Sequence, residues 1–434
     1  MLLIKGGRVI DPAGKRDETG SIVLENGKVK DFIPGDQTPK GFKGSVIDAS
    51  GKWVVPGLID MHVHLRDPGY EWKEDIRTGT KAAAAGGFSS VACMANTKPV
   101  NDHPEVTRYI RETAERNGAA DVFPVAAVTR GMGGKEMSDF AELADAGAVA
   151  FSDDGKPVES ALLMRRALEY AKAFDLLILS HAEDAELCRD GAAHEGWMAH
   201  KLGIPGIPSA AEEVAIARDI LLARQTGGKL HIQHISTKMG VDLLRMGKRA
   251  GVAVTGETAP HYFTLTDASL EGYNTNAKMN PPLRGEEDRM AVLSGLIDGT
   301  IDVIASDHAP HEDYVKRCEF IAAANGIIGL ETALPLSLGL LAGGKMTPAR
   351  IVELLCSNPA RILKLSGKGS LRKGADADVT VIDPDVEWEY READVRSKSR
   401  NSPFFGWKLR GRAVATVHGG RVTHSLLAEV AADV

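Results

Sequence analysis

The sequence predicts an α/β protein built on an eight-stranded (β/α)8 barrel, with a smaller β-rich module contributed by both ends of the chain. Eight apolar, β-branched runs alternate with helix-like stretches through the middle of the 434 residues. The helix-like stretches end at glycine, as helices often do. Eight strand–helix units in roughly 300 residues fit a barrel, which typically needs about 250. A doubly wound open sheet is the alternative.

Both ends of the chain have the pattern of short strands. Apolar and polar residues alternate between glycine-containing turns in five segments: 2–11, 21–33, 45–55, 377–385 and 413–424. The two ends therefore look like halves of one β module. We expect residues 1–54 and 366–434 to form this module, and residues 55–365 to form the barrel.

The barrel strands are expected in order along the middle of the chain. The eight apolar runs are residues 54–64, 88–97, 120–129, 148–154, 176–184, 229–236, 252–262 and 301–311. The clearest helices between them are residues 73–87, 104–118 and 209–228. In such a barrel, catalytic groups lie where the strands end and the loops to the helices begin.

Polar side chains gather at these strand ends. His62 and His64 are two residues apart on a strand, so both side chains point to the same face and can reach one metal ion. Five more polar residues end other strands: Asn96, Asp154, His181, His234 and Asp307. Imidazole and carboxylate groups suit zinc. Taken singly, residues 153–155 are also a plain turn, and His181 or His234 a core histidine. Five strands that each end in histidine or aspartate favour a metal site.

Composition and charge narrow the class of protein. The net charge of −7 gives no sign of a nucleic-acid partner. The four cysteines form no CxxC pair, which argues against a cysteine zinc site or a disulfide framework. The first residues lack the apolar run of a signal peptide, and no segment approaches the length of a membrane span. We expect a cytoplasmic enzyme that meets no membrane.

Several motifs together resemble one family. HVHLRDPG, MANTKPVND, SDDG, SHAED, QHIS and SDHAPH, with KMNPPLR and GLETALPL, resemble the motifs of class I dihydroorotases in the amidohydrolase superfamily. The resemblance implies a distorted (β/α)8 barrel with a small β-sandwich built from both termini. It also implies an activity: the reversible cyclisation of N-carbamoyl-L-aspartate to (S)-dihydroorotate with loss of water, in de novo pyrimidine (UMP) biosynthesis.

The resemblance assigns metal ligands residue by residue. His62, His64 and Asp154 would bind one zinc ion, and Asp154 would bridge to a second ion held by His181 and His234. Two zinc ions are favoured over one. Asp154 is chosen over Asp153 from its position in the motif alone. Asp307 would be both a ligand and the general acid and base, taking a proton from a zinc-bound hydroxide that attacks the ring carbonyl.

The resemblance also assigns a substrate pocket. Arg66, Asn96 and His311 would hold the α-carboxylate, and the fork of an arginine can bind a carboxylate through two hydrogen bonds. Asn280 would contact the ring or the carboxylate. The remaining expected contacts are His64, Leu65, Asn325 and Gly326. Asn325 stands where many relatives have Phe, which puts the local packing in doubt.

Two other kinds of protein remain as alternatives. Allantoinases and dihydropyrimidinases (hydantoinases) usually carry a carboxylated lysine where strand four ends, but AVAFSDDG has no lysine before Lys156. An inactive scaffold for aspartate transcarbamoylase should have lost metal ligands, and this chain retains every candidate. The sequence leaves open whether an active enzyme forms a homodimer or associates with that transcarbamoylase.

Overall fold

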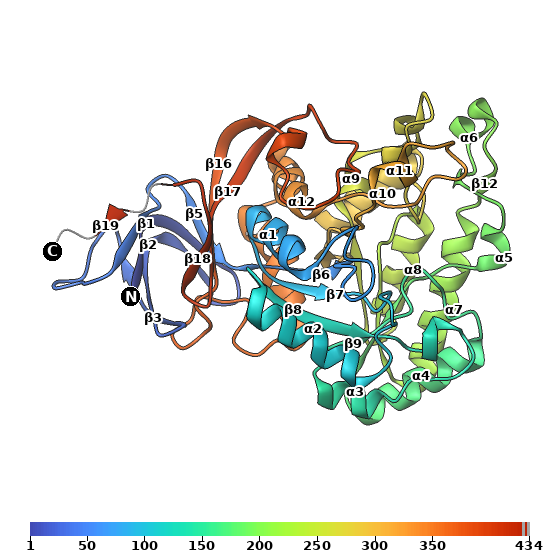
Figure 1. The fold of residues 1–434 in the computed structure, drawn as a ribbon, viewed down its shortest axis with the longest axis horizontal. Coiled ribbons are helices and arrows are strands. Elements are labelled where there is room, and N and C mark those ends of the chain that lie inside the picture. Colours follow the sequence, from blue (N-terminus) through green and yellow to red (C-terminus); the bar gives the residue numbers. More distant parts are fainter. Residues whose placement is uncertain (428–429, 432–434) are drawn as a thin grey trace.

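The computed structural model describes residues 1–427 and 430–431. Residues 428–429 and 432–434, which belong to the predicted C-terminal segment 366–434, lie outside the described part. The chain forms a barrel with a β-sheet packed beside it, and strands from both end regions of the chain belong to that sheet (Figure 1). No helix in the described part is long and apolar enough to cross a membrane.

The barrel has eight parallel strands, as predicted. They are β6 (Leu58–Val63), β7 (Phe88–Cys93), β8 (Asp121–Ala126), β9 (Ala150–Phe151), β10 (Leu177–Ser180), β13 (Lys229–Ile232), β14 (Val254–Thr258) and β15 (Val303–Ile304). They pair in this order from β6 to β15. The first and last strands meet only through a parallel bridge between Val63 and His308, beside which the His64 backbone N–H donates to the His308 carbonyl (2.9 Å). This seam closes the barrel.

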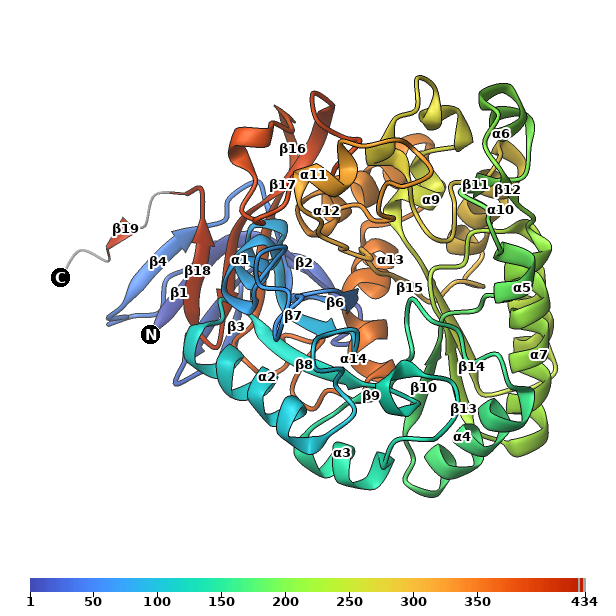
Figure 2. The same cartoon turned by 45° about the vertical axis from the view of Figure 1, so that its right-hand side comes forward.

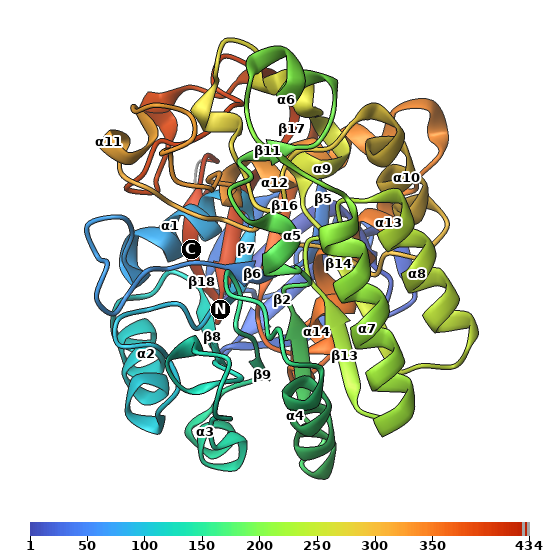
Figure 3. The ribbon, with the colours of Figure 1, turned by 90° about the vertical axis from the view of Figure 1, so that its right-hand side faces the viewer.

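Helices surround the strands (Figure 3). They are α1 (Ile76–Gly86), α2 (Pro104–Asn117), α3 (Phe140–Ala146), α4 (Ala161–Ala173), α7 (Ala210–Thr226), α8 (Lys238–Arg249), α10 (Glu286–Ile297), α12 (Leu330–Leu338), α13 (Pro348–Val352) and α14 (Asn358–Ile362). Local signals set their ends: the Asp75 side chain caps the start of α1, and Gly87 ends it with a φ of 95°. The predicted helices are confirmed, with ends shifted by a few residues.

Shorter elements interrupt the loops that follow β10, β14 and β15. They are α5 (Ala185–Cys188), β11 (Ala193–His194), α6 (Trp197–Leu202), β12 (Gly206–Ile207), α9 (Pro260–Thr264) and α11 (Asp313–Lys316). These loops leave the carboxyl ends of their strands, where a barrel carries its chemistry. They lie together above the strands in Figure 2.

The terminal sheet joins the two ends of the chain, as predicted. Its strands are β1 (Leu2–Asp11), β2 (Arg16–Glu25), β3 (Lys28–Pro34), β4 (Ser45–Asp48), β5 (Trp53–Pro56), β16 (Val379–Glu389), β17 (Lys408–His418), β18 (Arg421–Ser425) and β19 (Val430–Ala431). The strands form one continuous sheet, because β1 pairs with β4 along one half and with β5 along the other. Some of its buried apolar side chains form a core of their own, whereas others, such as Ile10, Val55 and Ile382, belong to the core of the barrel.

The passage from the terminal sheet to the barrel falls inside one apolar run of the sequence. The apolar run 54–64 is two strands: β5 pairs with β1 and β16 in the terminal sheet, and β6 opens the barrel. The chain passes between them at Gly57, where an added Cβ would lie 2.1 Å from the Ser89 hydroxyl. Only glycine permits so close an approach. The first segment of the terminal sheet therefore extends to Pro56.

Candidate active site

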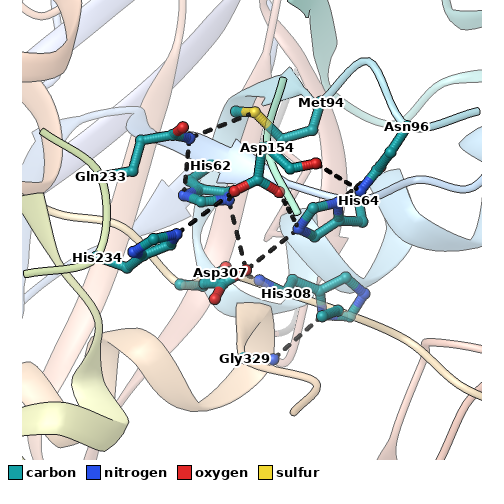
Figure 4. Close-up of polar contacts among 12 residues, drawn as sticks. His62, His64, Met94, Asn96, Asp154, Gln233, His234, Asp307, His308 and Gly329 are labelled. Carbon is teal, nitrogen blue, oxygen red and sulfur yellow. Dashed lines mark hydrogen bonds and ion pairs between the residues drawn. The ribbon is translucent and has the colours of Figure 1, made fainter. Parts of the chain in front are cut away.

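The barrel strands bring His62 and His64 to one carboxylate. His62 lies in β6 and His64 one residue beyond it. Their Nε2 atoms lie 3.4 Å from Asp154 Oδ1 and 3.4 Å from Asp154 Oδ2, respectively. All three residues are buried, and Figure 4 shows them facing one another at the ends of their strands. They form the first cluster that could hold a metal ion.

A second cluster shares the same aspartate. His181 follows β10 directly, and its Nδ1 lies 3.3 Å from Asp154 Oδ1. His234 follows β13, and its Nε2 lies 3.5 Å from the same oxygen and 2.7 Å from His181 Nδ1. Asp154 therefore belongs to both clusters. This is the arrangement expected of a carboxylate that bridges two metal ions.

Asp307 completes the group from the opposite side. Its Oδ1 lies 3.2 Å from His64 Nε2 and 3.5 Å from His62 Nε2. The backbone is in the left-handed region at Asp307, with a φ of 46°, and also at His234, with a φ of 35°. Non-glycine residues are held there only when their surroundings over-determine the conformation, and such residues cluster at functional sites.

The geometry separates Asp154 from Asp153. Asp153 turns away from the histidines to Thr129, whose backbone N–H donates to Asp153 Oδ1 (3.0 Å) and whose hydroxyl donates to the other oxygen. Burial raises the pKa of Asp153 to about 6. Asp153 thus fixes a loop, and Asp154 is the aspartate that faces the site.

Three of the four histidines are oriented by a hydrogen bond on the outer side of the ring. His62 Nδ1 lies 2.6 Å from Glu257, His64 Nδ1 lies 2.9 Å from Asn96, and His181 Nε2 lies 2.8 Å from Glu183. An outer acceptor holds the ring proton there and leaves the inner nitrogen free as a ligand.

The donor set fits a divalent cation. His62 Nε2 is buried and has no hydrogen-bond partner, although it lies among carboxylate oxygens. A buried polar atom without a partner is costly, and a metal ion would satisfy it. The four histidines and two aspartates offer ring nitrogens and carboxylate oxygens, which zinc accepts as ligands.

Charges of opposite sign are concentrated in this site. Burial lowers the pKa of His62, but the carboxylates of Asp154, Asp307 and Glu257 outweigh burial and raise this pKa well above its ordinary value. Burial opposes ionisation of Asp154, yet the facing histidines hold its pKa well below the usual range. The carboxylates are therefore ionised. A bound cation would take the place of the histidine protons.

The predicted substrate residues lie beside this centre. The half-buried Arg66 donates from Nε to the Pro310 carbonyl (3.3 Å), and its Nη2 lies 3.4 Å from His311 Nε2. Burial and the charges of Arg66, Lys73 and Lys316 lower the pKa of His311 to about 2, so its ring is neutral. Within the described residues, Arg66 has no carboxylate within 4.0 Å. Its charge is available to an anion from outside.

The other predicted contacts differ in what they offer. Asn280 donates to Glu183 (3.1 Å), which connects it to His181. Gly326 is buried with a φ of 147°, and an added Cβ would lie 2.7 Å from the Ala309 carbonyl. Asn325 is exposed, so replacing the family's usual Phe costs no core packing. The Leu65 side chain packs in the barrel core, which leaves only its backbone for a ligand.

Sequence reasoning missed Glu183 and Glu257. Both are buried or nearly so, and the neighbouring histidines overcome burial to lower the pKa of each to about 2. Glu257 lies inside the largely buried strand β14, and an acidic residue in a buried strand is the signal that could have found it. His308 points away from the metal-ligand candidates: its Nδ1 accepts from the Gly329 N–H (3.2 Å; Figure 4).

Comparisons with known proteins identify the family. Residues 51–240 match the family model described as dihydro-orotase-like. The dihydroorotase of Geobacter metallireducens is 54% identical over 423 residues, covering 98% of this chain and 99% of that protein. The dihydroorotase of Trichlorobacter lovleyi is 53% identical over 424 residues, with the same coverage. The chain belongs to the dihydroorotase family. The class of enzyme predicted from the motifs is confirmed.

Solved structures place the fold of this dihydroorotase-family chain in a wider group. The L-hydantoinase (dihydropyrimidinase) of Arthrobacter aurescens matches with a TM-score of 0.87 and 26% identity, covering 99% of this chain and 97% of that one. The D-hydantoinase of a Thermus species matches with a TM-score of 0.83 and 25% identity over the same shares. The barrel with its terminal sheet is therefore a fold that this chain shares with these enzymes.

Proposed function

We propose that the protein catalyses the reversible cyclisation of N-carbamoyl-L-aspartate to (S)-dihydroorotate with loss of water, a step in pyrimidine (UMP) synthesis. One observation carries the choice of substrate. Arg66, a cation with no carboxylate partner in the described structure, lies against His311 beside the His–Asp metal centre. Both proposed substrates carry an α-carboxylate that pairs with Arg66 when the reacting carbonyl lies at the metal centre.

The proposed cofactor is zinc, with two ions per subunit. His62, His64 and Asp154 would hold one ion, His181, His234 and Asp154 would hold the other, and Asp307 would add a further oxygen ligand. This assignment is supported by the Asp154 carboxylate shared between the two clusters. Bound zinc supplies Lewis acidity, which polarises a carbonyl and lowers the pKa of a coordinated water to about 7.

The side chains around the proposed metal site have separate roles in proton transfer and substrate binding. Asp307 accepts the proton of the attacking water during ring opening and delivers it to the departing ring nitrogen, so that one C–O bond forms as one C–N bond breaks. In the direction of synthesis the same carboxylate returns the proton to the leaving water. Arg66, Asn96 and His311 hold the α-carboxylate, and Asn280 with the backbone at Gly326 holds the ring. Contacts from His64, Leu65 and Asn325 complete the proposed pocket.

Hydantoinase or allantoinase activity is the rival, because the fold is shared with hydantoinases. Hydantoin and dihydrouracil carry no carboxylate and would leave Arg66 unpaired. Asp154 lies between the two histidine pairs, and the strand run that leads to it, residues 148–154, contains no lysine. An inactive scaffold is disfavoured because all six candidate ligands converge.

One experiment decides among these functions. Purified protein is assayed for ring opening of dihydroorotate, allantoin and dihydrouracil, and the zinc content of the same sample is measured. We expect about two zinc ions per chain and turnover of dihydroorotate far above the other two substrates. Faster turnover of dihydrouracil or allantoin would reject the proposed substrate, and an inactive, metal-free protein would reject the enzyme.

The proposal also covers location and assembly. All four cysteines are free, which suits a reducing compartment, and we propose the cytoplasm. A homodimer and an association with aspartate transcarbamoylase are both compatible with an active barrel. Sedimentation of the protein alone and mixed with the transcarbamoylase tests both.

A further inference from the structure

Arg66 and His311 come from loops on opposite sides of the barrel seam. Arg66 lies on the loop after β6, and His311 on the loop after β15. The seam itself is weakly paired, because β15 has only two residues and meets β6 through the single bridge at Val63 and His308. Beyond this bridge, Arg66 contacts the second loop directly only through Pro310 and His311 among the hydrogen bonds of the described structure. A third segment adds contacts to both loops.

A segment from outside the barrel contacts both loops. Residues 397–401, here called the strap, lie in the connection between β16 and β17, which passes near α11 and α12 in Figure 2. Ser397, Ser399 and Asn401 are buried and alternate with more exposed Lys398 and Arg400. This period of two is that of an extended chain with one face inward. The inward face is polar, so the strap contributes hydrogen bonds to the barrel rather than apolar packing.

One half of the strap holds the loop that carries Arg66. The Ser399 hydroxyl donates to the Lys73 carbonyl (2.7 Å), and the Ser397 hydroxyl donates to the buried carboxylate of Glu74. Lys398 Nζ donates to the Glu71 carbonyl (2.7 Å). These contacts fasten the β6–α1 loop on the side away from the metal centre.

The other half holds the loop that carries His311. Asn401 Oδ1 accepts from the His311 backbone N–H (3.0 Å). Asn401 Nδ2 donates to the carbonyls of Ala309 (2.9 Å) and Gly326 (3.0 Å). The amide thus uses both of its donor hydrogens and its acceptor oxygen on this loop. It joins the start of the loop to its far end, where the substrate ring is expected.

We infer that Asn401 is a positioning residue for the carboxylate pocket: it holds His311 and Gly326 in register while the rest of the strap holds the Arg66 loop. This inference rests on the proposed function, because it assumes that Arg66 and His311 bind the substrate carboxylate. Asn401 touches neither the metal ligands nor the substrate. Its loss should weaken substrate binding and leave the metal centre intact.

The test compares Asn401→Ala with Asn358→Ala. Asn358 also donates to a backbone carbonyl, that of Asp302 (2.9 Å), at the other end of β15. For Asn401→Ala we expect KM for dihydroorotate to rise about tenfold or more, with kcat and zinc content near those of the wild type, because uniform binding is lost. Asn358→Ala should keep the wild-type KM. A second control, Ser402→Ala, removes a hydroxyl that accepts only from the nearby Phe404 N–H.

Two further variants keep the inference testable if Asn401→Ala does not fold. Asn401→Asp keeps an oxygen acceptor for the His311 N–H, but its second oxygen replaces the amide nitrogen that donates to the carbonyls of Ala309 and Gly326. This variant should also raise KM. Ser399→Ala removes one bond to the Arg66 loop and should raise KM about threefold. A wild-type KM in the folded variants overturns the inference, as does a fall in zinc content that matches the fall in kcat/KM. Absence of dihydroorotate turnover in the wild type would instead reject the proposed function.

Discussion

The metal centre and the carboxylate pocket are built by different means. The metal-centre residues lie within three positions of a barrel strand end, and the outer nitrogens of His62, His64 and His181 are each held by a neighbouring side chain. The pocket residues Arg66 and His311 lie on loops whose positions depend on the strap. On the proposed function, the barrel strands supply the hydrolytic centre, whereas loops held by a segment outside the barrel recognise the substrate.

The largest expected effect comes from removing the shared aspartate. Asp154→Ala takes a ligand from both clusters, so zinc content and activity should fall together below detection. Asp153→Ala is the matched control, because it changes the adjacent carboxylate that bonds Thr129. Loss of that buried hydrogen bond costs about 1–3 kcal/mol of stability. Metal content, activity and thermal unfolding are measured on both variants. If only Asp153→Ala lost metal, Asp153 and not Asp154 would be the bridging ligand.

Asp307→Asn should reduce turnover next most strongly. The amide keeps an oxygen toward His62 and His64 but cannot accept a proton. General acid–base catalysis contributes about 10²–10⁴-fold, so we expect kcat to fall by that factor. Zinc content, measured on the same sample, should fall much less. If the residual activity of Asp307→Asn merely followed its zinc occupancy, Asp307 would be a ligand without a role in proton transfer.

The same contrast explains what sequence reasoning reached. His62 and His181 were predicted because strand periodicity places them at one end of a parallel barrel, a short-range argument that needs no contact map. The break at Gly57 was missed, because an unbroken apolar run does not show that its halves join different sheets. Asn401 was missed because its partners lie 75 to 92 residues away in sequence. No local pattern reports such contacts.

Glu257→Gln tests how firmly the metal centre is oriented from outside. The amide is close in shape to the carboxylate but lacks the charge that favours the proton on His62 Nδ1. Such outer partners typically change metal affinity about 10–100-fold. We expect a loss of zinc affinity in that range, measured by competition with a chelator, and activity restored by excess zinc. Glu212→Gln is the control, a buried carboxylate that pairs with Arg284 and touches no histidine of the site. Equal losses in the two variants would point to general destabilisation.

The smallest expected effect separates substrate choice from chemistry. Arg66→Met keeps the length of the side chain and removes its charge. A hydrogen bond to a charged group contributes about 1.5–3 kcal/mol, so kcat/KM for dihydroorotate should fall about tenfold or more. Dihydrouracil, which has no carboxylate, loses nothing, and the preference for dihydroorotate should narrow by the same factor. Lys73→Met is the matched control, since it removes a cation at the same mouth that already faces Glu312 (3.7 Å). Both substrates are measured on wild type and variants at equal zinc content. An unchanged substrate preference in Arg66→Met would mean that another group recognises the carboxylate. If the preference for dihydroorotate narrowed as much in Lys73→Met, the pocket would respond to net charge and not to the guanidinium of Arg66 in particular.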